Sequence, residues 1–363
     1  MVIVVFGLSA CGNAGGGATV QTYPASPQNA SPPRESSPSM GTSPSSQAAW
    51  RLPVATGNGG NAAIAGFISL PTGAFSADHQ GDLANNSVGN PPLTGTASGT
   101  NVATYPSYDL QQHRWVPVTL RQLSPDGSQY AYAEWVMPAG PINGPTPPSA
   151  IRIHVVDVSA AADRIIYTTS KQLLSVVAFL TEGIYVTNQC WEGCGGVGGM
   201  WLLNPSTGDL STVLTAEADH TDWRLINNGI AWGIGPWGGP DQIGDKIFRL
   251  DISTRSVTRW STPTNFGDLV GVDSRGFPLV QEQDPYTGAV KLWDEDSPTS
   301  GSELFTSPTV VHFSAPTSGP CGTLIGSTAG LYQFTSDGAL QVVSTDMPIQ
   351  PAGLVVAGPC VAA

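Results

Sequence analysis

A hairpin pattern that returns about every 46 residues is the feature that most restricts the fold of this chain. Each occurrence has a run of alternating apolar and polar residues, a cluster of turn-forming residues, and a second alternating run, which is the pattern of two antiparallel strands joined by a turn. Asp or Asn at the end of the first strand can accept hydrogen bonds from backbone N–H groups two residues further on. The turns fall around Asp109, Asp157, Asn204, Asp251, Asp294 and Thr335.

A second feature recurs out of phase with the hairpins. A turn glycine precedes a short apolar run at Gly183, Gly229, Gly276 and Gly322, and another apolar run lies upstream of each. No segment shows a long apolar pattern of helical period. About four short strands in each repeat, arranged radially, are typical of a β-propeller blade. We therefore predict an all-β fold: a single β-propeller of four-stranded antiparallel blades over residues 49–363, with six blades favoured and seven possible.

Both ends of this region carry strand patterns that complete one blade. The C-terminal run AGLVVAGPCVAA predicts two inner strands, and the segment NAAIAGFISLPTG together with the hairpin at 105–118 predicts outer strands. A first blade built from both chain ends closes the ring and hides the strand edges that an open ring exposes. Residues 71–100 and 138–149 are rich in Gly, Asn, Ser and Pro, and this composition predicts loops.

Residues 1–10 are almost wholly apolar, too few to cross a membrane as a helix, and fit the apolar region of a secretory signal. The sequence Leu8-Ser9-Ala10-Cys11 resembles the bacterial lipobox. This resemblance implies cleavage before Cys11 and attachment of a diacylglycerol to its sulfur. No basic residue precedes the apolar run, so we expect the true start codon to lie upstream. The alternative is a buried strand that ends in an unrelated cysteine.

Residues 11–48 are dominated by Gly, Ser, Pro, Ala and Gln. Such a segment buries too little apolar surface to offset its conformational entropy, so we expect a disordered tether. A lipid anchor followed by a tether predicts an extracytoplasmic protein that is lipid-anchored at the bacterial cell membrane or envelope.

The segment LSPDGSQYAYAEW, residues 123–135, resembles a blade motif of TolB-type and related WD-repeat-like propellers. The resemblance implies that Pro125 and Gly127 serve the geometry of a turn and that Asp126 hydrogen-bonds the local backbone. It also implies an extracytoplasmic interaction protein rather than a particular reaction.

Four cysteines remain when Cys11 is set aside, an even number that an oxidising compartment permits to pair. We predict that Cys190 pairs with Cys194 inside a glycine-rich turn. Cys321 and Cys360 both follow Gly-Pro, and their pairing would tie the closing strands to the neighbouring blade. The rival arrangement crosses the two sets.

Charge and motifs narrow the range of functions. The formal net charge of −13 repels a nucleic-acid backbone. The five histidines are scattered without a zinc-binding pattern, and the sequence holds no nucleophile elbow, phosphate-binding loop or dinucleotide fingerprint. We therefore predict no metal, no cofactor and no catalytic residue. The only His–carboxylate clusters are Asp78-His79 and residues 219–222, which we expect in solvated loops.

Trp191, Trp232 and Trp237 lie in glycine-rich connections. Exposed there, they are candidates to stack on sugar rings or to receive a partner's anchor residue; the alternative is packing between blades. The sequence thus favours a monomeric, membrane-tethered, non-catalytic binding or scaffold module for an envelope protein, peptide or glycan. The alternatives are a propeller-type enzyme, a glycan hydrolase or lyase with its site at the axial mouth, and a purely structural envelope protein.

Overall fold

The computed structural model describes most of the chain from residue 49 onward. The described residues are 49–56, 64–86, 106–138, 147–189, 198–215, 221–235, 246–261, 266–336, 338–345 and 353–363. The chain divides into two units, Met1–Gln47 and Ala48–Ala363, and every described residue belongs to the second. The predicted signal segment, Cys11 and the predicted tether lie outside the described residues.

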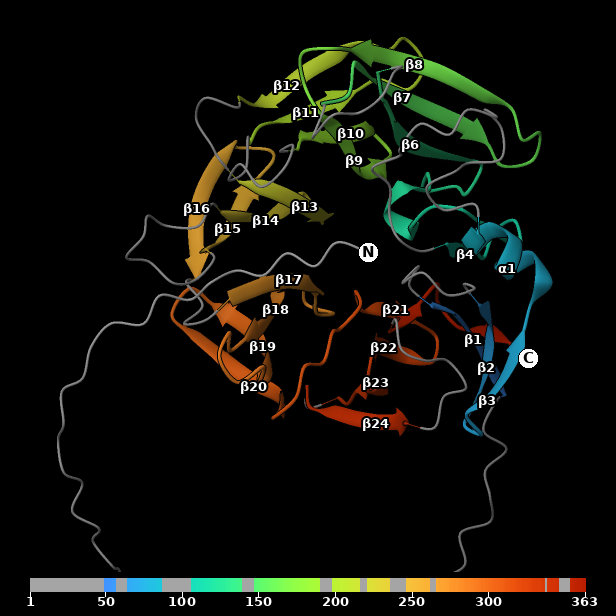
Figure 1. The fold of residues 1–363 in the computed structure, drawn as a ribbon, viewed down its shortest axis with the longest axis vertical. Coiled ribbons are helices and arrows are strands. Elements are labelled where there is room, and N and C mark those ends of the chain that lie inside the picture. Colours follow the sequence, from blue (N-terminus) through green and yellow to red (C-terminus); the bar gives the residue numbers. More distant parts are fainter. Residues whose placement is uncertain are drawn as a thin grey trace, which may run out of the picture. The chain divides into compact units, whose positions relative to one another are not determined.

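The second unit is a β-propeller. Figure 1 shows its antiparallel sheets following one another around a centre, and four of them have four strands each in chain order. The first of these sheets consists of β9 (Leu174–Leu180), β10 (Gly183–Asn188), β11 (Met200–Leu203) and β12 (Leu210–Leu214), and the second of β13 (Asp222–Asn227), β14 (Ile230–Gly235), β15 (Lys246–Asp251) and β16 (Ser256–Ser261). The third consists of β17 (Phe266–Val272), β18 (Pro278–Gln283), β19 (Val290–Ser297) and β20 (Ser300–Ser307). The fourth consists of β21 (Thr317–Gly319), β22 (Gly322–Ser327), β23 (Gly330–Phe334) and β24 (Leu340–Ser344). The prediction of an all-β propeller with four-stranded antiparallel blades is confirmed.

Burial explains why these segments form inner and outer strands. Every residue of β10, with the sequence GIYVTN, is buried, because neighbouring sheets cover both of its faces. The outer strand β16, with the sequence SVTRWS, has no buried residue. Branched and aromatic residues suit the pleated surface of both strands, and hydrophobicity decides which of them lies inside.

The sheet that closes the ring combines both ends of the unit. Its strands are β1 (Trp50–Thr56), β2 (Ala65–Leu70), β3 (Ala74–Ala77), β25 (Leu354–Val356) and β26 (Val361–Ala362). Val54 pairs with Val356, and Trp50 pairs with Ala362, in antiparallel register. Closure by strands from both ends is therefore confirmed.

Two details of the predicted closure are wrong. Both C-terminal strands pair with β1, so they share one inner position instead of filling two. The outer strands are β2 and β3, because the hairpin expected there forms a sheet of its own, β4 (Ser107–Asp109) with β5 (Arg114–Val116). The remaining sheet has three strands, β6 (Gln129–Val136), β7 (Ala150–Asp157) and β8 (Asp163–Thr169). The number of blades stays a prediction, since the β4–β5 hairpin stands apart.

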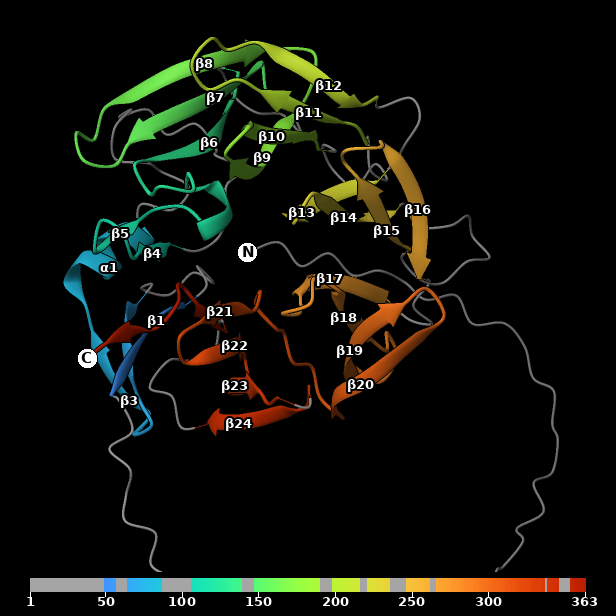
Figure 2. The same ribbon diagram turned by 180° about the vertical axis from the view of Figure 1, so that it is seen from behind.

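The loop predicted over residues 71–100 is wrong for its first part, which contains β3 and the helix α1 (His79–Asn86). Asp78 begins the helix by accepting the Gln80 backbone N–H through Oδ1 at 3.0 Å. Gly81 permits close packing, because a Cβ there would lie 2.8 Å from atoms of Ala65 and Trp115. Figure 2 shows α1 beside the β4–β5 hairpin. Tertiary packing and a cap thus outweigh a turn-like composition.

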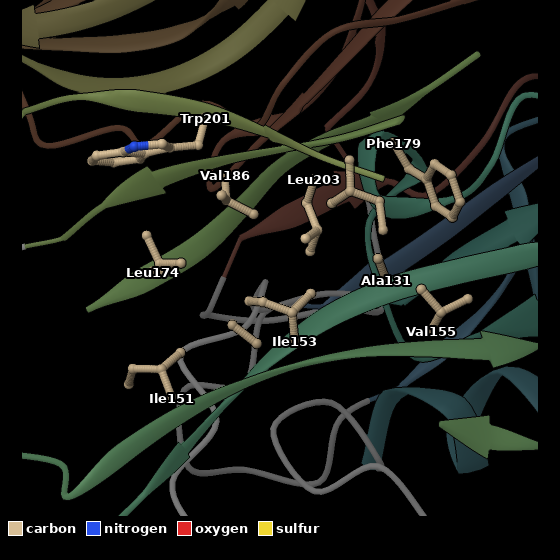
Figure 3. Close-up of a cluster of buried hydrophobic side chains, with 11 residues drawn as sticks. Ala131, Ile151, Ile153, Val155, Leu174, Phe179, Val186, Trp201 and Leu203 are labelled. Carbon is tan, nitrogen blue, oxygen red and sulfur yellow. The ribbon is translucent and has the colours of Figure 1, made fainter. Parts of the chain in front are cut away.

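Buried apolar clusters join neighbouring sheets around the ring. Figure 3 shows the cluster between the β6–β8 sheet and the β9–β12 sheet, where Ile153 and Val186 are both fully buried. Similar clusters lie between β9–β12 and β13–β16, between β13–β16 and β17–β20, and between β17–β20 and β21–β24. Burial of apolar surface between sheets is the main favourable term that holds such a ring together.

The predicted turn chemistry holds in most hairpins. Asp157 Oδ1 accepts the backbone N–H groups of Ser159 and Ala160, and Asp251 accepts that of Thr254. Asp294 is an exception: it lies inside β19 and pairs with Arg275, because the strand continues to Ser297.

The motif at 123–135 behaves as its resemblance implies. Asp126 accepts the Ser128 backbone N–H at 3.1 Å. Gly127 has a φ of 67°, and a Cβ there would lie 2.7 Å from a carboxylate oxygen of Asp109. Glycine is therefore required at this turn for both conformation and space.

Within the described residues, no helix is both long and apolar enough to cross a membrane.

Candidate functional site

The inner strands of several sheets border a pocket with a volume of about 470 Å³. This is within the size range of small-molecule and peptide side-chain sites, roughly 300–1,000 Å³. Its walls come from β4, the 3₁₀ helix η1 (Leu120–Gln122), β17, the segment that leads into β21, and β25. The lining residues are Pro106, Ser107, Thr119, Leu120, Arg121, Asp268, Leu269, Val270, Phe313, Ser314, Ala315, Pro316, Thr317, Ser318, Val355, Val356, Ala357 and Pro359. We refer to it as the axial pocket.

Most of the lining of the axial pocket is aliphatic or proline. Its hydroxyl groups are engaged by the protein: Ser107 donates to the Val118 carbonyl at 2.7 Å, and Ser314 donates to the Gly326 carbonyl at 3.2 Å. Arg121 and Asp268 are the charged groups among these lining residues. The chemistry of the pocket therefore depends on how these two charges are compensated.

Asp268 is paired with a neighbouring arginine, which it shares with a second carboxylate. Arg224 on β13 donates from Nε to Asp222 at 2.8 Å and from Nη1 to Asp268 on β17. Burial by itself would lower the pKa of Arg224, but the attraction of the two carboxylates has the larger combined effect, so the pKa of Arg224 is raised. The three residues bridge two neighbouring sheets at the pocket, and with two carboxylates and one guanidinium they carry one net negative charge.

Arg121 is not compensated in this way. Its Nη1 donates to the backbone carbonyl of Arg224 at 3.1 Å, and no carboxylate of the described residues lies within 4.0 Å of its guanidinium. Burial lowers the pKa of Arg121 to about 10. The side chain therefore stays protonated at neutral pH and brings an unpaired positive charge to the pocket.

Sequence reasoning missed Arg121, Arg224 and Asp268 as site residues. They lie on η1, β13 and β17, far apart along the chain, and no local motif surrounds them. Their convergence depends on the ring. A weak signal was available, because arginines are scarce in a chain with 14 Lys and Arg in total.

Trp232 does not lie where the sequence predicted. It belongs to β14, is 2% exposed, and packs in the cluster between the β13–β16 and β17–β20 sheets. Its ring meets that of Trp260 edge to face, with centroids 5.1 Å apart. The prediction of an exposed ligand-binding tryptophan is wrong here, because the strand continues through the glycines to Gly235. Trp191 and Trp237 lie outside the described residues.

The predicted pair Cys321–Cys360 is present as a disulfide with a Cα–Cα distance of 6.0 Å. Cys321 precedes β22, and Cys360 lies between β25 and β26. The bond thus links the closing sheet to its neighbour, as predicted. Cys190 and Cys194 lie outside the described residues, and their pairing stays a prediction.

The described chain holds a His–carboxylate set that the sequence did not suggest. His154 on β7 is 1% exposed, with Nδ1 3.0 Å from both Asp163 oxygens and Nε2 3.2 Å from Glu134 Oε2. Tyr132 stacks on the imidazole and donates to Asp163 at 2.9 Å. None of these residues lines the axial pocket. The set braces the β6–β8 sheet rather than facing a ligand.

Tyr132→Phe tests this bracing role. The change keeps the stacked ring but removes the hydroxyl donor to Asp163, so we expect a loss of about 1–2 kcal/mol in the free energy of unfolding. Urea titration measures it, and Tyr286→Phe, at a tyrosine that is 89% exposed, is the control. Equal stability of the two variants would show that the hydroxyl contributes nothing.

A second prediction concerns Glu295, whose Oε2 is buried without a hydrogen-bond partner. Burial, with Glu282 nearby, raises its pKa. Because the folded state favours the protonated form, the ionised carboxylate costs stability as the pH rises through its folded pKa. We expect Glu295→Gln to raise the melting temperature at neutral pH by about 1–2 °C, and this gain to vanish towards pH 4.5, the ordinary carboxyl value. Calorimetry across pH measures both; Glu303→Gln, a carboxylate paired with Lys291 on the same sheet, should give no gain.

No group of three or more His, Cys, Asp or Glu side chains among the described residues is placed to hold a metal ion. The two His–carboxylate clusters of the sequence were expected in solvated loops, but their described carboxylates have structural partners. Asp78 caps α1 and accepts a hydrogen bond from the Trp115 Nε1–H at 3.1 Å, and Asp222 pairs with Arg224.

No protein-family model matches the chain, and no curated protein sequence matches it. Similar solved structures include TolB from Acinetobacter baumannii, 12% identical over 85% of this chain and 67% of that chain, with a TM-score of 0.47. They also include a nidogen/laminin complex, 10% identical over 86% and 98%, with a TM-score of 0.41. A third is an acylaminoacyl peptidase from Pyrococcus horikoshii, 10% identical over 82% and 50%, with a TM-score of 0.49. Likeness at this level assigns neither a family nor an activity to the chain.

Proposed function

We propose that this protein is an extracytoplasmic, membrane-tethered binding module that acts without catalysis and takes its ligand, a protein, peptide or glycan, at the axial pocket. The observation that carries the proposal is the pocket itself, in which Arg121 brings a charge that no carboxylate of the described residues compensates. Concave sites with apolar walls and a few polar groups are the usual form of ligand sites.

The chemistry of the pocket supports binding over reaction. Its described lining contains no histidine, cysteine or lysine, the side chains that most often act as bases or nucleophiles. Asp268, its one carboxylate, is held by Arg224. The His154 set does not line the pocket, and His154 itself is buried. A hydrolase or lyase would need an accessible acid–base pair at the mouth.

A substitution that fills the pocket tests the proposal. Ala315 lines the pocket, so Ala315→Trp is designed to occlude it, and Val342→Trp, on the exposed face of β24, is the matched control. Full-length protein in detergent is used to capture partners from envelope extracts, followed by mass spectrometry. We expect a partner that the wild type and Val342→Trp retain and that Ala315→Trp loses. Capture that is indifferent to Ala315→Trp rules out the pocket, and chemical turnover of the captured ligand favours an enzyme.

Attachment to the membrane is the second part of the proposal. A diacylglycerol on Cys11 supplies two acyl chains, which meets the requirement for stable anchoring. In a precursor with a complete basic n-region, we expect Cys11→Ala to leave the protein uncleaved or to release it from membranes, as judged by fractionation and by labelling with a radioactive fatty acid. A Cys11→Ala protein that is still cleaved and is retained in membranes to the same extent as the wild type would remove the lipid anchor from the proposal.

A further inference from the structure

Of the two charged residues that line the axial pocket, Arg121 is the one without an oppositely charged partner among the described residues. Its guanidinium carries several N–H donors, and its one hydrogen bond within the described residues goes to the carbonyl of Arg224. The side chain is half-buried among the inner strands. A buried charge without a counter-charge is costly, so an anion at this position would gain a charge-assisted hydrogen bond that the free protein leaves unmade.

The surroundings restrict which anion fits. Arg121 is the single cation of the lining, and Asp268 adds negative charge on another wall. A group with one negative charge balances one guanidinium, whereas a phosphate group with close to two charges would remain undercompensated and would meet Asp268. The planar fork of arginine matches carboxylate and phosphate alike in a bidentate arrangement, so the charge of the ligand decides between them. A carboxylate is therefore the favoured anion.

The apolar walls of the axial pocket restrict the kind of molecule to which the carboxylate belongs. Leu120, Phe313, Val355 and three prolines line the pocket, and Phe313 is the one aromatic ring among the lining residues. Sugars bind best to exposed tryptophan and tyrosine faces and to free hydrogen-bonding groups, but the lining hydroxyls of Ser107 and Ser314 already donate to backbone carbonyls. Aliphatic walls match an apolar amino-acid side chain, whose burial contributes about 1.5–3 kcal/mol. The pocket therefore fits a peptide better than a glycan.

We infer that the axial pocket binds a peptide carboxylate next to an apolar side chain, with the guanidinium of Arg121 holding the carboxylate and the aliphatic walls holding the side chain. The inference rests on the proposed binding function and names its ligand class. The carboxylate is supplied either by a chain terminus or by an internal acidic residue.

Three synthetic tripeptides distinguish these sources. One is acetyl-Ala-Leu-Phe with a free terminal carboxylate, the second is the same peptide as its terminal amide, and the third is acetyl-Leu-Asp-Phe amide, which carries the carboxylate internally. Isothermal titration of the full-length protein in detergent measures their affinities. We expect one or both carboxylate peptides to bind roughly tenfold to a hundredfold more tightly than the uncharged amide, the range for one hydrogen bond to a charged group. The tighter of the two identifies the source.

Variants at Arg121 assign the effect to this residue. We expect Arg121→Gln to lose the preference for the carboxylate peptides, and Arg121→Lys to retain part of it, because lysine keeps the charge but not the fork. Arg255→Gln, at an exposed arginine in the turn between β15 and β16, is the matched control and should bind as the wild type does. Melting temperatures of all variants confirm that they are folded.

Equal affinity for acid and amide, an unaltered preference in folded Arg121→Gln, or no binding of either carboxylate peptide at millimolar concentration overturns the inference. If envelope capture still depends on Ala315 in that case, the proposed binding function stands and only the ligand class is wrong. If capture ignores Ala315→Trp, the proposed function itself fails, whatever the peptides do.

Discussion

Trp232→Ala is expected to lower the free energy of unfolding by about 3–5 kcal/mol, the usual cost of truncating a fully buried large aromatic side chain. The indole lies between the β13–β16 and β17–β20 sheets, where it contacts a cluster that includes Leu225, Ile247 and Val280. Removal of the ring leaves a cavity at the junction of two sheets. The strands around it are hydrogen-bonded on both sides, so the cavity collapses only in part.

Urea titration and calorimetry measure this loss. Trp232→Phe should cost less than Trp232→Ala, because a phenyl ring fills part of the space and removes an indole N–H that is buried without a partner. Tyr286→Ala, at an aromatic residue that is 89% exposed, is the control and should stay within about 0.5 kcal/mol of the wild type. A near-neutral Trp232→Ala with weakened ligand capture would instead place the indole at a binding surface.

The second large effect is expected from the disulfide. Replacement of both Cys321 and Cys360 by alanine should cost about 4 kcal/mol in the chain-entropy model, because the bond closes a loop of 39 residues. The register explains why the bond matters: β1 holds β25 through three residue pairs and β26 through two. These short strands close the ring, so a covalent link beside them limits opening of the unit at its two ends.

Reduction gives a matched comparison for the disulfide variant. Wild-type protein in excess reductant should unfold at nearly the same urea concentration as Cys321→Ala/Cys360→Ala, and reductant should change the variant little. Peptide mapping without reduction should recover a linked peptide that contains both cysteines. Free thiols at both positions, or a peptide crossed to Cys190 or Cys194, would contradict the ring-closing role.

The ion pair of Arg224 with Asp268 joins residues that are far apart in the sequence, so no single segment of the chain predicts it. Asp222 and Arg224 are neighbours on β13, but Asp268 reaches them only because β17 lies next to β13 at the inside of the ring. Arg121 lies on the 3₁₀ helix η1, outside these two sheets, and donates to the Arg224 backbone carbonyl. A charge on an inner strand gains or loses partners according to the neighbouring sheets, and sequence spacing does not encode that neighbourhood.

Trp232 and the helix α1 illustrate the same limit for local structure. Glycines around Trp232 suggested an exposed connection, yet Gly233 and Gly235 lie within β14, where a Cβ would come within 2.7 Å of its neighbours. These glycines permit close packing instead of marking a loop. Likewise, the mainly polar segment 79–86 forms a helix, because Asp78 caps its start and the helix packs beside β2 and β5.

What the sequence determined by itself is the repeat, and through it the class of fold. Alternation of apolar and polar residues with period two, turn residues that bind their own backbone, and a constant repeat length are local properties, so hairpins and four-stranded sheets follow from them without knowledge of the whole. The positions of Cys321 and Cys360 after Gly-Pro also anticipated their pairing, because equivalent places in neighbouring repeats meet at the closure. The tertiary structure alone decided which strands share the closing sheet, that Trp232 is buried, and that Arg121 reaches the axial pocket without a carboxylate partner among the described residues. Each of these features depends on contacts between sheets, because the side chains that pack together or pair their charges there come from residues far apart in the chain.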